Sequence, residues 1–252
     1  SVMFFLGLGN GAKGYMNKMV TDLANPNVPL VMKRVTEDNN KKNDEAMGES
    51  QQSMIVNSEK TAITDTLVDK VAKLDHVKKV EKDFNVIPAN LEVTIGAIKE
   101  PFRQLQTWTD MNTDSSLLTG EKPGQNEVVV TDTFAKKWDK SNWKKLVGKT
   151  IHVSYKMADT AGKEVDIAQD LKVSGVINGN AATNALTMNF KTVSQVFKDK
   201  GLVSDPNYIV PTIDDSHNVD SVVKKIQSLK TNGKKDFVTF SVGTVLEPIN
   251  TI

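Results

Sequence analysis

Three glycines near the start of the chain have the spacing of a phosphate-binding turn. Gly9, Gly11 and Gly14 follow an apolar run and open a helical pattern, and Glu37 lies just beyond the next apolar run. In a dinucleotide-binding unit such glycines let the backbone approach a pyrophosphate, and the acid holds the ribose. Small residues where a membrane helix leaves the bilayer explain the same glycines. The polar residues 36–58 interrupt the run of strands that a dinucleotide-binding domain needs. A nucleotide-binding (Rossmann-type) oxidoreductase using Gly9, Gly11 and Gly14 is therefore the alternative function and not the first one.

A second pattern spaces oxygen ligands as a calcium-binding loop does. The loop positions that carry side-chain ligands in an EF-hand are occupied here by Asp110, Asn112, Asp114 and Glu121. Ser115 stands where the sharp turn of such a loop needs glycine, and no flanking helices are evident. We expect a solvated surface loop, with calcium binding left open.

The remaining polar residues lack the spacing of a catalytic or metal site. His76, His152 and His217 are far apart, and no serine comes with a positioned histidine and acid. Asp214 and Asp215 precede a helix, where acidic residues are ordinary. The absence of cysteine excludes disulfides, thiolate metal sites and cysteine nucleophiles. The sequence therefore predicts no catalytic, cofactor-binding or metal-binding residue, and a protein that is not an enzyme.

Two groups of surface-active residues have both a plain and a functional interpretation. The lysine pairs are expected on solvated faces, with attraction to anionic lipid or cell-wall polymer as the alternative: Lys136-Lys137, Lys144-Lys145 and Lys224-Lys225. Trp108, Trp138 and Trp143 are expected in the core, with an exposed patch that holds a peptide, lipid or protein as the alternative.

Composition bounds the class of protein. The 252 residues are enough for one large domain or two smaller ones, and 38% hydrophobic with 25% charged residues is a soluble composition. Only Arg34 and Arg103 among the 32 basic residues are arginine, and the net charge is +1. Because guanidinium groups are the usual readers of guanine edges and phosphates, these values argue against nucleic acid as a partner.

Hydrophobic periodicity predicts the elements of the first half. The chain opens on an apolar run, read as the end of a membrane helix, and a helical stripe continues it with Tyr15, Met16, Met19 and Leu23. A strand is expected over 28–35, a mobile surface loop over 36–58, and a helix over 63–74 with Thr64 as its N-cap. Strands are expected over 77–80 and 91–98, and a short helix with Phe102, Leu105 and Trp108.

The second half has clearer strand signals. Val128 to Val130 form a β-branched run that ends at Thr131, the expected cap of a helix with Phe134, Ala135 and Trp138 on one face. A hairpin over 150–177 follows the Gly148-Lys149 turn. Further elements are expected in chain order: a helix over 193–197, a strand over 208–213, a helix capped by Asn218 and stopped by Asn232-Gly233, and a strand over 237–242.

Residues 126–177 carry a family resemblance. Their segments NEVVVTDTFAKKW, LVGKTIHVSY and LKVSGVIN contain Phe-Ala-Lys-Lys, Val-Gly-Lys-Thr-Ile and Val-x-Gly-Val in that order. In order and residue type this block resembles the periplasmic core domain of MacB-like, FtsX-type ABC transporter permeases. The likeness extends more weakly over residues 60–240, and the long segment 36–58 departs from it.

The resemblance implies an α+β fold in three parts. These are an N-terminal stalk helix over 1–25, a discontinuous split βαβ-type (porter-like) subdomain near the membrane, formed by 26–100 and 204–252, and an inserted β-rich (sabre-like) subdomain over 101–203. Tyr15, Met16, Met19 and Leu23 are expected to pack in the stalk.

The resemblance also implies a function and a location. It implies a domain on the extracytoplasmic side of the cell membrane, between the first two membrane helices of a permease homodimer or heterodimer. A cytoplasmic ABC ATPase subunit would drive export, of antimicrobial peptides for example, or mechanical work on an extracellular peptide, lipid or protein. A cell-wall adhesin without an ATPase partner is a third reading. Fold alone does not choose the substrate.

Overall fold

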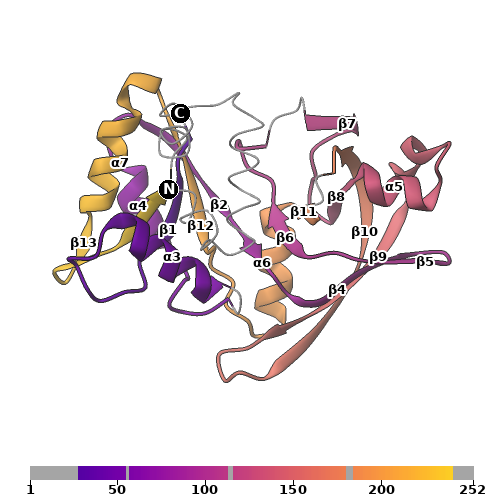
Figure 1. The fold of residues 1–252 in the computed structure, drawn as a ribbon, viewed down its shortest axis with the longest axis horizontal. Coiled ribbons are helices and arrows are strands. Elements are labelled where there is room, and N and C mark those ends of the chain that lie inside the picture. Colours follow the sequence, from indigo (N-terminus) through magenta and orange to yellow (C-terminus); the bar gives the residue numbers. More distant parts are fainter. Residues whose placement is uncertain (1–27, 55–56, 113–115, 180–183, 241–252) are drawn as a thin grey trace, which may run out of the picture. The chain divides into compact units, whose positions relative to one another are not determined.

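The computed structural model describes residues 28–54, 57–112, 116–179 and 184–240 (Figure 1). The chain splits into two compact units, which are described one at a time. The smaller sheet lies in the unit formed by the described parts of Ser1–Asp83, Thr109–Met111 and Asp205–Ile252. The larger sheet lies in the unit of Phe84–Trp108 and Asn112–Ser204. The expected α+β class is confirmed, whereas the expected stalk helix over 1–25 lies outside the described residues.

The first unit is built on a four-stranded antiparallel sheet. Its strands lie in the order β15 (Phe237–Phe240), β1 (Leu30–Lys33), β12 (Tyr208–Ile213) and β2 (Val77–Asp83). The strands β1 and β2 run parallel to each other with β12 between them, and β12 and β15 have β1 between them. Two interleaved split βαβ units of this kind make a ferredoxin-like arrangement, which confirms the expected architecture.

Two helices cover one face of this sheet. Helix α4 (Asp65–Ala72) begins after Thr64, whose hydroxyl accepts a hydrogen bond from the Leu67 N–H, as predicted. Helix α7 (Val219–Ser228) follows the short 3₁₀ turn η4 (Ser216–Asn218). Asn218 stands at the expected cap position but makes no capping bond, because its amide donates to Asp214 instead. The buried stripes of both helices share one core cluster with the strands.

A third helix covers the other face, where the prediction of a mobile loop over 36–58 is wrong. Helix α3 (Asn43–Ser53) buries Ala46 and Met47 in a cluster with Leu30, Met32 and Val238 of the sheet. The helix is mostly polar and carries no capping side chain, so its own sequence gives a weak signal. Packing against a preformed sheet supplies the stability that local propensity does not.

The second unit is built on a nine-stranded mixed sheet. Its main path runs β3-β6-β11-β8-β10-β9-β4-β5, β7 pairs β10, and the pairs β6–β11 and β8–β10 are parallel. The strands are β3 (Asn85–Val86), β4 (Ala89–Ile95), β5 (Ile98–Pro101), β6 (Gln104–Thr107), β7 (Leu117–Gly120), β8 (Glu127–Thr131), β9 (Thr150–Ala158), β10 (Glu164–Ile177) and β11 (Ala185–Met188).

Short helices pack on the sheet around one core cluster. Helix α5 (Asp132–Trp138) follows β8 and begins after Thr131, whose hydroxyl accepts from the Phe134 N–H, as predicted. The 3₁₀ helix η3 (Trp143–Leu146) precedes the hairpin of β9 and β10. Helix α6 (Phe190–Asp199) sets Phe197 edge-on against Phe84, with ring centroids 5.2 Å apart.

Three further predictions differ from the structure. The short helix expected around Leu105 is the buried strand β6, whose glutamines are held by side-chain partners across the sheet. Strand β4 pairs with β9 in the larger sheet and β5 pairs with β4, whereas the expected division kept residues up to 100 with the first subdomain. Asn232-Gly233 does not end α7, which stops at Ser228; it forms the turn between β13 (Lys230–Thr231) and β14 (Lys234–Lys235).

Candidate functional site

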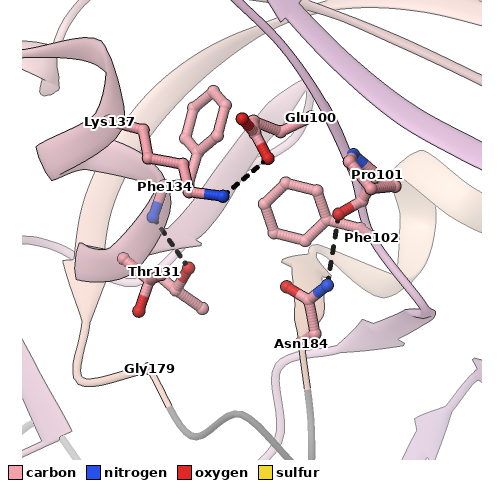
Figure 2. A pocket seen from close by; sticks show the side chains of 9 residues that line it. Glu100, Pro101, Phe102, Thr131, Phe134, Lys137, Gly179 and Asn184 are labelled. Carbon is pink, nitrogen blue, oxygen red and sulfur yellow. Dashed lines mark hydrogen bonds and ion pairs between the residues drawn. The ribbon is translucent and has the colours of Figure 1, made fainter.

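The candidate site is a pocket of about 410 Å³ in the larger unit. Figure 2 shows its walls, which come from the end of β5, the start of α5, Gly179 after β10 and Asn184 before β11. The other lining residues are Glu100, Pro101, Phe102, Thr131, Thr133, Phe134 and Lys137.

Aromatic rings form the apolar wall. Phe102 and Phe134 meet edge to face, with ring centroids 5.6 Å apart. Both are almost fully buried, since the Thr131 cap fixes the first turn of α5 and so turns Phe134 toward the sheet. Aromatic pairs of this geometry are rigid and contribute about 0.5–1.5 kcal/mol beyond their buried area.

Polar groups form the rim. The Lys137 ammonium pairs with the Glu100 carboxylate at 2.9 Å, and the Asn184 amide donates to the Pro101 carbonyl at 3.1 Å (Figure 2). Both interactions are solvent-exposed, so they contribute little stability but orient polar groups around the opening.

A half-buried carboxylate binds the backbone at Gly179, next to the pocket. The Gly179 N–H donates to Asp132 Oδ1 at 2.7 Å, and the Lys136 ammonium pairs with Asp132 Oδ2 at 3.0 Å. Burial raises the pKa of the Asp132 carboxyl, but these hydrogen bonds lower it overall below its ordinary value. A Cβ on Gly179 would lie 2.8 Å from the Thr133 hydroxyl, so the close approach requires glycine.

The pocket offers contact chemistry. Apolar walls with a few placed polar groups suit an apolar side chain or acyl segment that carries a polar end. The described residues that line it include no histidine, cysteine or serine that could act as base or nucleophile. Sequence reasoning identified Thr131 and Phe134 as helix residues but missed the pocket, because Phe102 and Asn184 reach it only through the sheet.

The residues expected to carry function in the N-terminal segment are outside the described part of the chain. These are the stalk residues Tyr15, Met16, Met19 and Leu23, and the turn glycines Gly9, Gly11 and Gly14. Glu37, the expected ribose ligand, is exposed and pairs with Lys234 at 3.2 Å. The sheet that β1 enters is antiparallel throughout, whereas a dinucleotide site needs parallel strands.

The calcium pattern is not supported by the geometry. Asp110 pairs with Lys79 at 2.7 Å, and Glu121 is tied through its backbone to Ser174. Asp114 lies outside the described residues. Within the described ranges, no group of three or more histidines, aspartates or glutamates could hold a metal ion.

Each histidine has an aspartate partner on the surface. His76 pairs with Asp214 at 2.9 Å, and His217 pairs with Asp215 at 2.7 Å. These partners lower the pKa of both carboxyls. His152 lies on the polar phase of β9, as predicted, and pairs with Asp170 at 2.8 Å. Single exposed pairs of this kind stabilise a fold little.

The tryptophans and lysines largely follow their plain interpretation. Trp138 and Trp143 pack half-buried against the core of the larger unit, as expected. The ammonium groups of Lys136 and Lys144 lie 5.4 and 5.6 Å from the centre of the Trp143 ring. The backbone N–H of Trp108 donates to the Met188 carbonyl.

The glycines of the resembling motifs have backbone roles. Gly148 has a φ of +92°, a conformation that other residues rarely adopt, and its N–H donates to the Val173 carbonyl. Gly175 lies opposite Gly120 where β7 crosses β10, and a Cβ there would lie 2.6 Å from the Glu121 carbonyl. Both motifs are therefore explained by strand pairing.

The family model of the MacB-like periplasmic core domain matches residues 1–229. The chain belongs to this family. It is accordingly the extracellular domain of a MacB/FtsX-like ABC transporter permease, a class of domain that is generally not enzymatic. No curated protein matches the chain. Among the described residues, no helix is both long and apolar enough to cross a bilayer.

A solved structure shows the same fold for this MacB-like domain. It is the crystal structure of the extracellular domain of the ABC-type transporter YknZ from Gram-positive bacteria. The two chains superimpose with a TM-score of 0.55 at 12% identity, covering 85% of this chain and all of the other. At that identity the likeness supports the fold.

Proposed function

We propose that this MacB-like domain relays movement from an ATP-driven permease to a peptide, lipid or protein outside the membrane. Its ATPase partner would be a cytoplasmic ABC subunit, and the permease would act as a dimer. The stalk residues Tyr15, Met16, Met19 and Leu23 are proposed to pack where the movement enters. In this proposal the first unit is the porter-like subdomain and the second the sabre-like one.

The strand registers of the first unit carry the proposal. Leu30 at the start of β1 lies opposite Phe240 at the end of β15, so the chain enters and leaves at one end of the sheet. At the other end Tyr208 lies opposite Asp83, the last residue before the larger unit, and Tyr208 itself comes shortly after that unit ends at Ser204. A four-stranded sheet with both faces covered therefore lies in the covalent path between the tethers and the second unit.

The outer edge of that path is reinforced. Edge strand β15 is bracketed by Asn43, whose amide donates to the Thr239 carbonyl and accepts from the Thr239 N–H, at 2.8 and 3.0 Å. Gln227 donates to the Thr239 hydroxyl at 2.7 Å. These contacts oppose peeling of β15 from β1, as a relay of force requires.

Flexible insertions in the full-length permease with its ATPase test the relay. The chain passes between the units at four points, and a Gly-Ser segment of about ten residues after each of Asp83, Trp108, Met111 and Ser204 keeps every core residue but lengthens all connections between the units. We expect transport to be lost while ATP hydrolysis continues. The same insertion in the exposed β9–β10 turn at Ala161 is the matched control and should leave transport unchanged. Unchanged transport with all four connections lengthened would overturn the relay.

The stalk assignment has its own test. Tyr15→Asp and Met16→Asp should uncouple ATP hydrolysis from transport, because a charge in a packed helix face prevents its burial. Full coupling in both variants would sink the assignment of these residues.

We also propose that the pocket beside α5 is where the larger unit contacts its partner. Thr133→Trp fills the opening from an exposed position, and Lys140→Trp adds the same side chain at an exposed site outside the lining. Transport should fall in Thr133→Trp and persist in Lys140→Trp. Equal transport in the two variants, at equal amounts of permease, contradicts this role.

A further inference from the structure

A second cavity, in the first unit, has no acidic residue among the described residues that line it. It holds about 280 Å³ and lies between the start of α3, the loop before it, and β14. Its charged lining residues are Arg34, Lys41, Lys42 and Lys235, and its other walls are side-chain amides and Phe237.

Arg34 is the unusual member of this lining. It is 7% exposed, and its Nη2 donates to the carbonyls of Asp38 and Lys41 at 2.8 and 2.9 Å. Its Nε is buried without a hydrogen-bond partner, and no carboxylate of the described residues forms an ion pair with it. A buried guanidinium is costly unless an anion compensates its charge.

The other cations are also poorly compensated. Lys42 and Lys235 form no ion pair within the described part of the chain, whereas Lys41 is held by Glu49. Glu49 lies near enough to Arg34 for the guanidinium to lower the pKa of its carboxyl, but its hydrogen bond goes to Lys41. The lining therefore holds more positive than negative charge at the start of an 11-residue helix that has no side-chain cap, although Asp44 and Glu45 in the first turn of that helix offset part of it.

The amides keep the cavity open by binding the backbone around it. Asn39 donates to the Gly233 carbonyl and accepts from the Lys235 N–H, at 3.0 and 3.1 Å, and Asn43 brackets Thr239. These bonds hold the loop at a fixed distance from β14 and β15. The positive groups are thus placed before any ligand arrives, which lowers the entropy cost of binding.

We propose that this cavity binds a phosphate group, with Arg34, Lys42 and Lys235 as its charged ligands. Arginine and uncapped helix N–H groups both match the oxygens of a phosphate, and the volume admits a phosphate with a small substituent. The source is a free phosphate, a phosphate of a soluble polymer, or a lipid headgroup. The site is separate from the pocket beside α5 and does not depend on the relay.

Calorimetry of the 252-residue chain with inorganic phosphate and with glycerol 3-phosphate tests the site. We expect saturable binding at fixed ionic strength, weakened at least about tenfold in Lys42→Gln/Lys235→Gln, since two charge-assisted contacts are removed. Lys191→Gln/Lys198→Gln removes the same charge from exposed positions of the other unit and should bind as the unaltered chain does. No saturable binding, or equal affinity in the two double variants, would overturn the proposal.

Arg34 and the source of the phosphate are tested separately. The folded Arg34→Met variant should not bind phosphate. If Arg34→Met does not fold, Lys42→Gln/Lys235→Gln still tests the site. Flotation with vesicles of phosphatidylglycerol, against vesicles of phosphatidylcholine, distinguishes the sources. Binding to the anionic vesicles that falls in Lys42→Gln/Lys235→Gln indicates a headgroup, and binding to glycerol 3-phosphate alone indicates a soluble phosphate.

Discussion

Single residues in the larger unit show how burial and hydrogen bonding oppose each other. Asp132 is half-buried yet stays charged, because the Gly179 N–H and the Lys136 ammonium both stabilise its carboxylate. Tyr155 is more deeply buried, and its hydroxyl lacks a hydrogen-bond partner among the described residues. The hydrogen bonds of Asp132 stabilise the fold, whereas burial of the unpartnered Tyr155 hydroxyl destabilises it.

The Asp132 interaction predicts a pH dependence. A carboxyl whose pKa is lowered by folding contributes stability above its unfolded pKa of about 4, and that contribution is lost as the pH falls through the folded pKa. Asp132→Asn should therefore lower the free energy of unfolding by about 1–2 kcal/mol at pH 7 and by less at pH 3. Urea denaturation at both values measures this. Asp166→Asn, at an exposed position, is the control and should change little at either pH.

The Tyr155 hydroxyl gives a prediction of opposite sign. Burial raises the pKa of Tyr155, so the group stays neutral, but an unpartnered buried hydroxyl still loses its hydration. Tyr155→Phe should leave the free energy of unfolding unchanged or raise it by up to about 1 kcal/mol. Tyr155→Leu, which also removes ring packing, should lower it. A clear loss in Tyr155→Phe would show that the hydroxyl has a partner.

At the scale of elements, the close pairing of β7 with β10 leaves no room for a side chain at Gly175. Strand β10 pairs with β9 along its first part and with β7 and β8 along its last, and its pairing with β8 shifts register between Val173 and Gly175. Ser174 and Glu121 exchange backbone and hydroxyl hydrogen bonds at the crossing. The Val-x-Gly-Val motif is a requirement of this geometry.

The crossing predicts a sharp difference between two glycines. Gly175→Ala places a methyl group against backbone and should lower the free energy of unfolding by about 1–3 kcal/mol. Gly48→Ala, in α3 with open space around it, should raise that free energy by about 0.5–1 kcal/mol. Urea denaturation measures both. Similar effects of the two substitutions would contradict the close approach of β7.

At the scale of the whole molecule, each unit has its own core. The clusters on both faces of the four-stranded sheet contain only residues of the first unit, and the third cluster contains only residues of the second. Met111, carried by the short segment Thr109–Met111, is the part of the first core that comes from within the insertion.

Separate cores predict that the first unit folds without the insertion. Asp83 and Tyr208 lie opposite each other, so a two-residue Asn-Gly turn can replace residues 84–207. The shortened chain should unfold cooperatively in urea with helix and strand signals in circular dichroism. Deletion also removes the buried Met111, which leaves a cavity in the first core. The free energy of unfolding of the shortened chain should therefore be about 2–5 kcal/mol lower than that of a second version in which a larger core side chain fills this cavity. An unfolded product in both versions would show that the sheet needs the second unit.

The sequence determined the elements whose signals are local. Thr64 and Thr131 cap their helices as predicted, and the hairpin of β9 and β10 follows from alternation, since capping and alternation act within a few residues. The sequence also indicated the family, through two motifs whose glycines lie at a turn, Gly148, and at the pairing of β7 with β10, Gly175.

Tertiary structure decided the rest. Helix α3 forms because Ala46 and Met47 meet a sheet whose strands come from both halves of the chain, and β6 is a strand because its neighbours pair with it. The Phe102–Phe134 pocket and the Arg34 cavity join residues that are far apart in sequence, so no local pattern marks them. The packing energy between segments distant in sequence exceeds their weak local propensity. That energy depends on which segments come into contact, which only the tertiary structure shows.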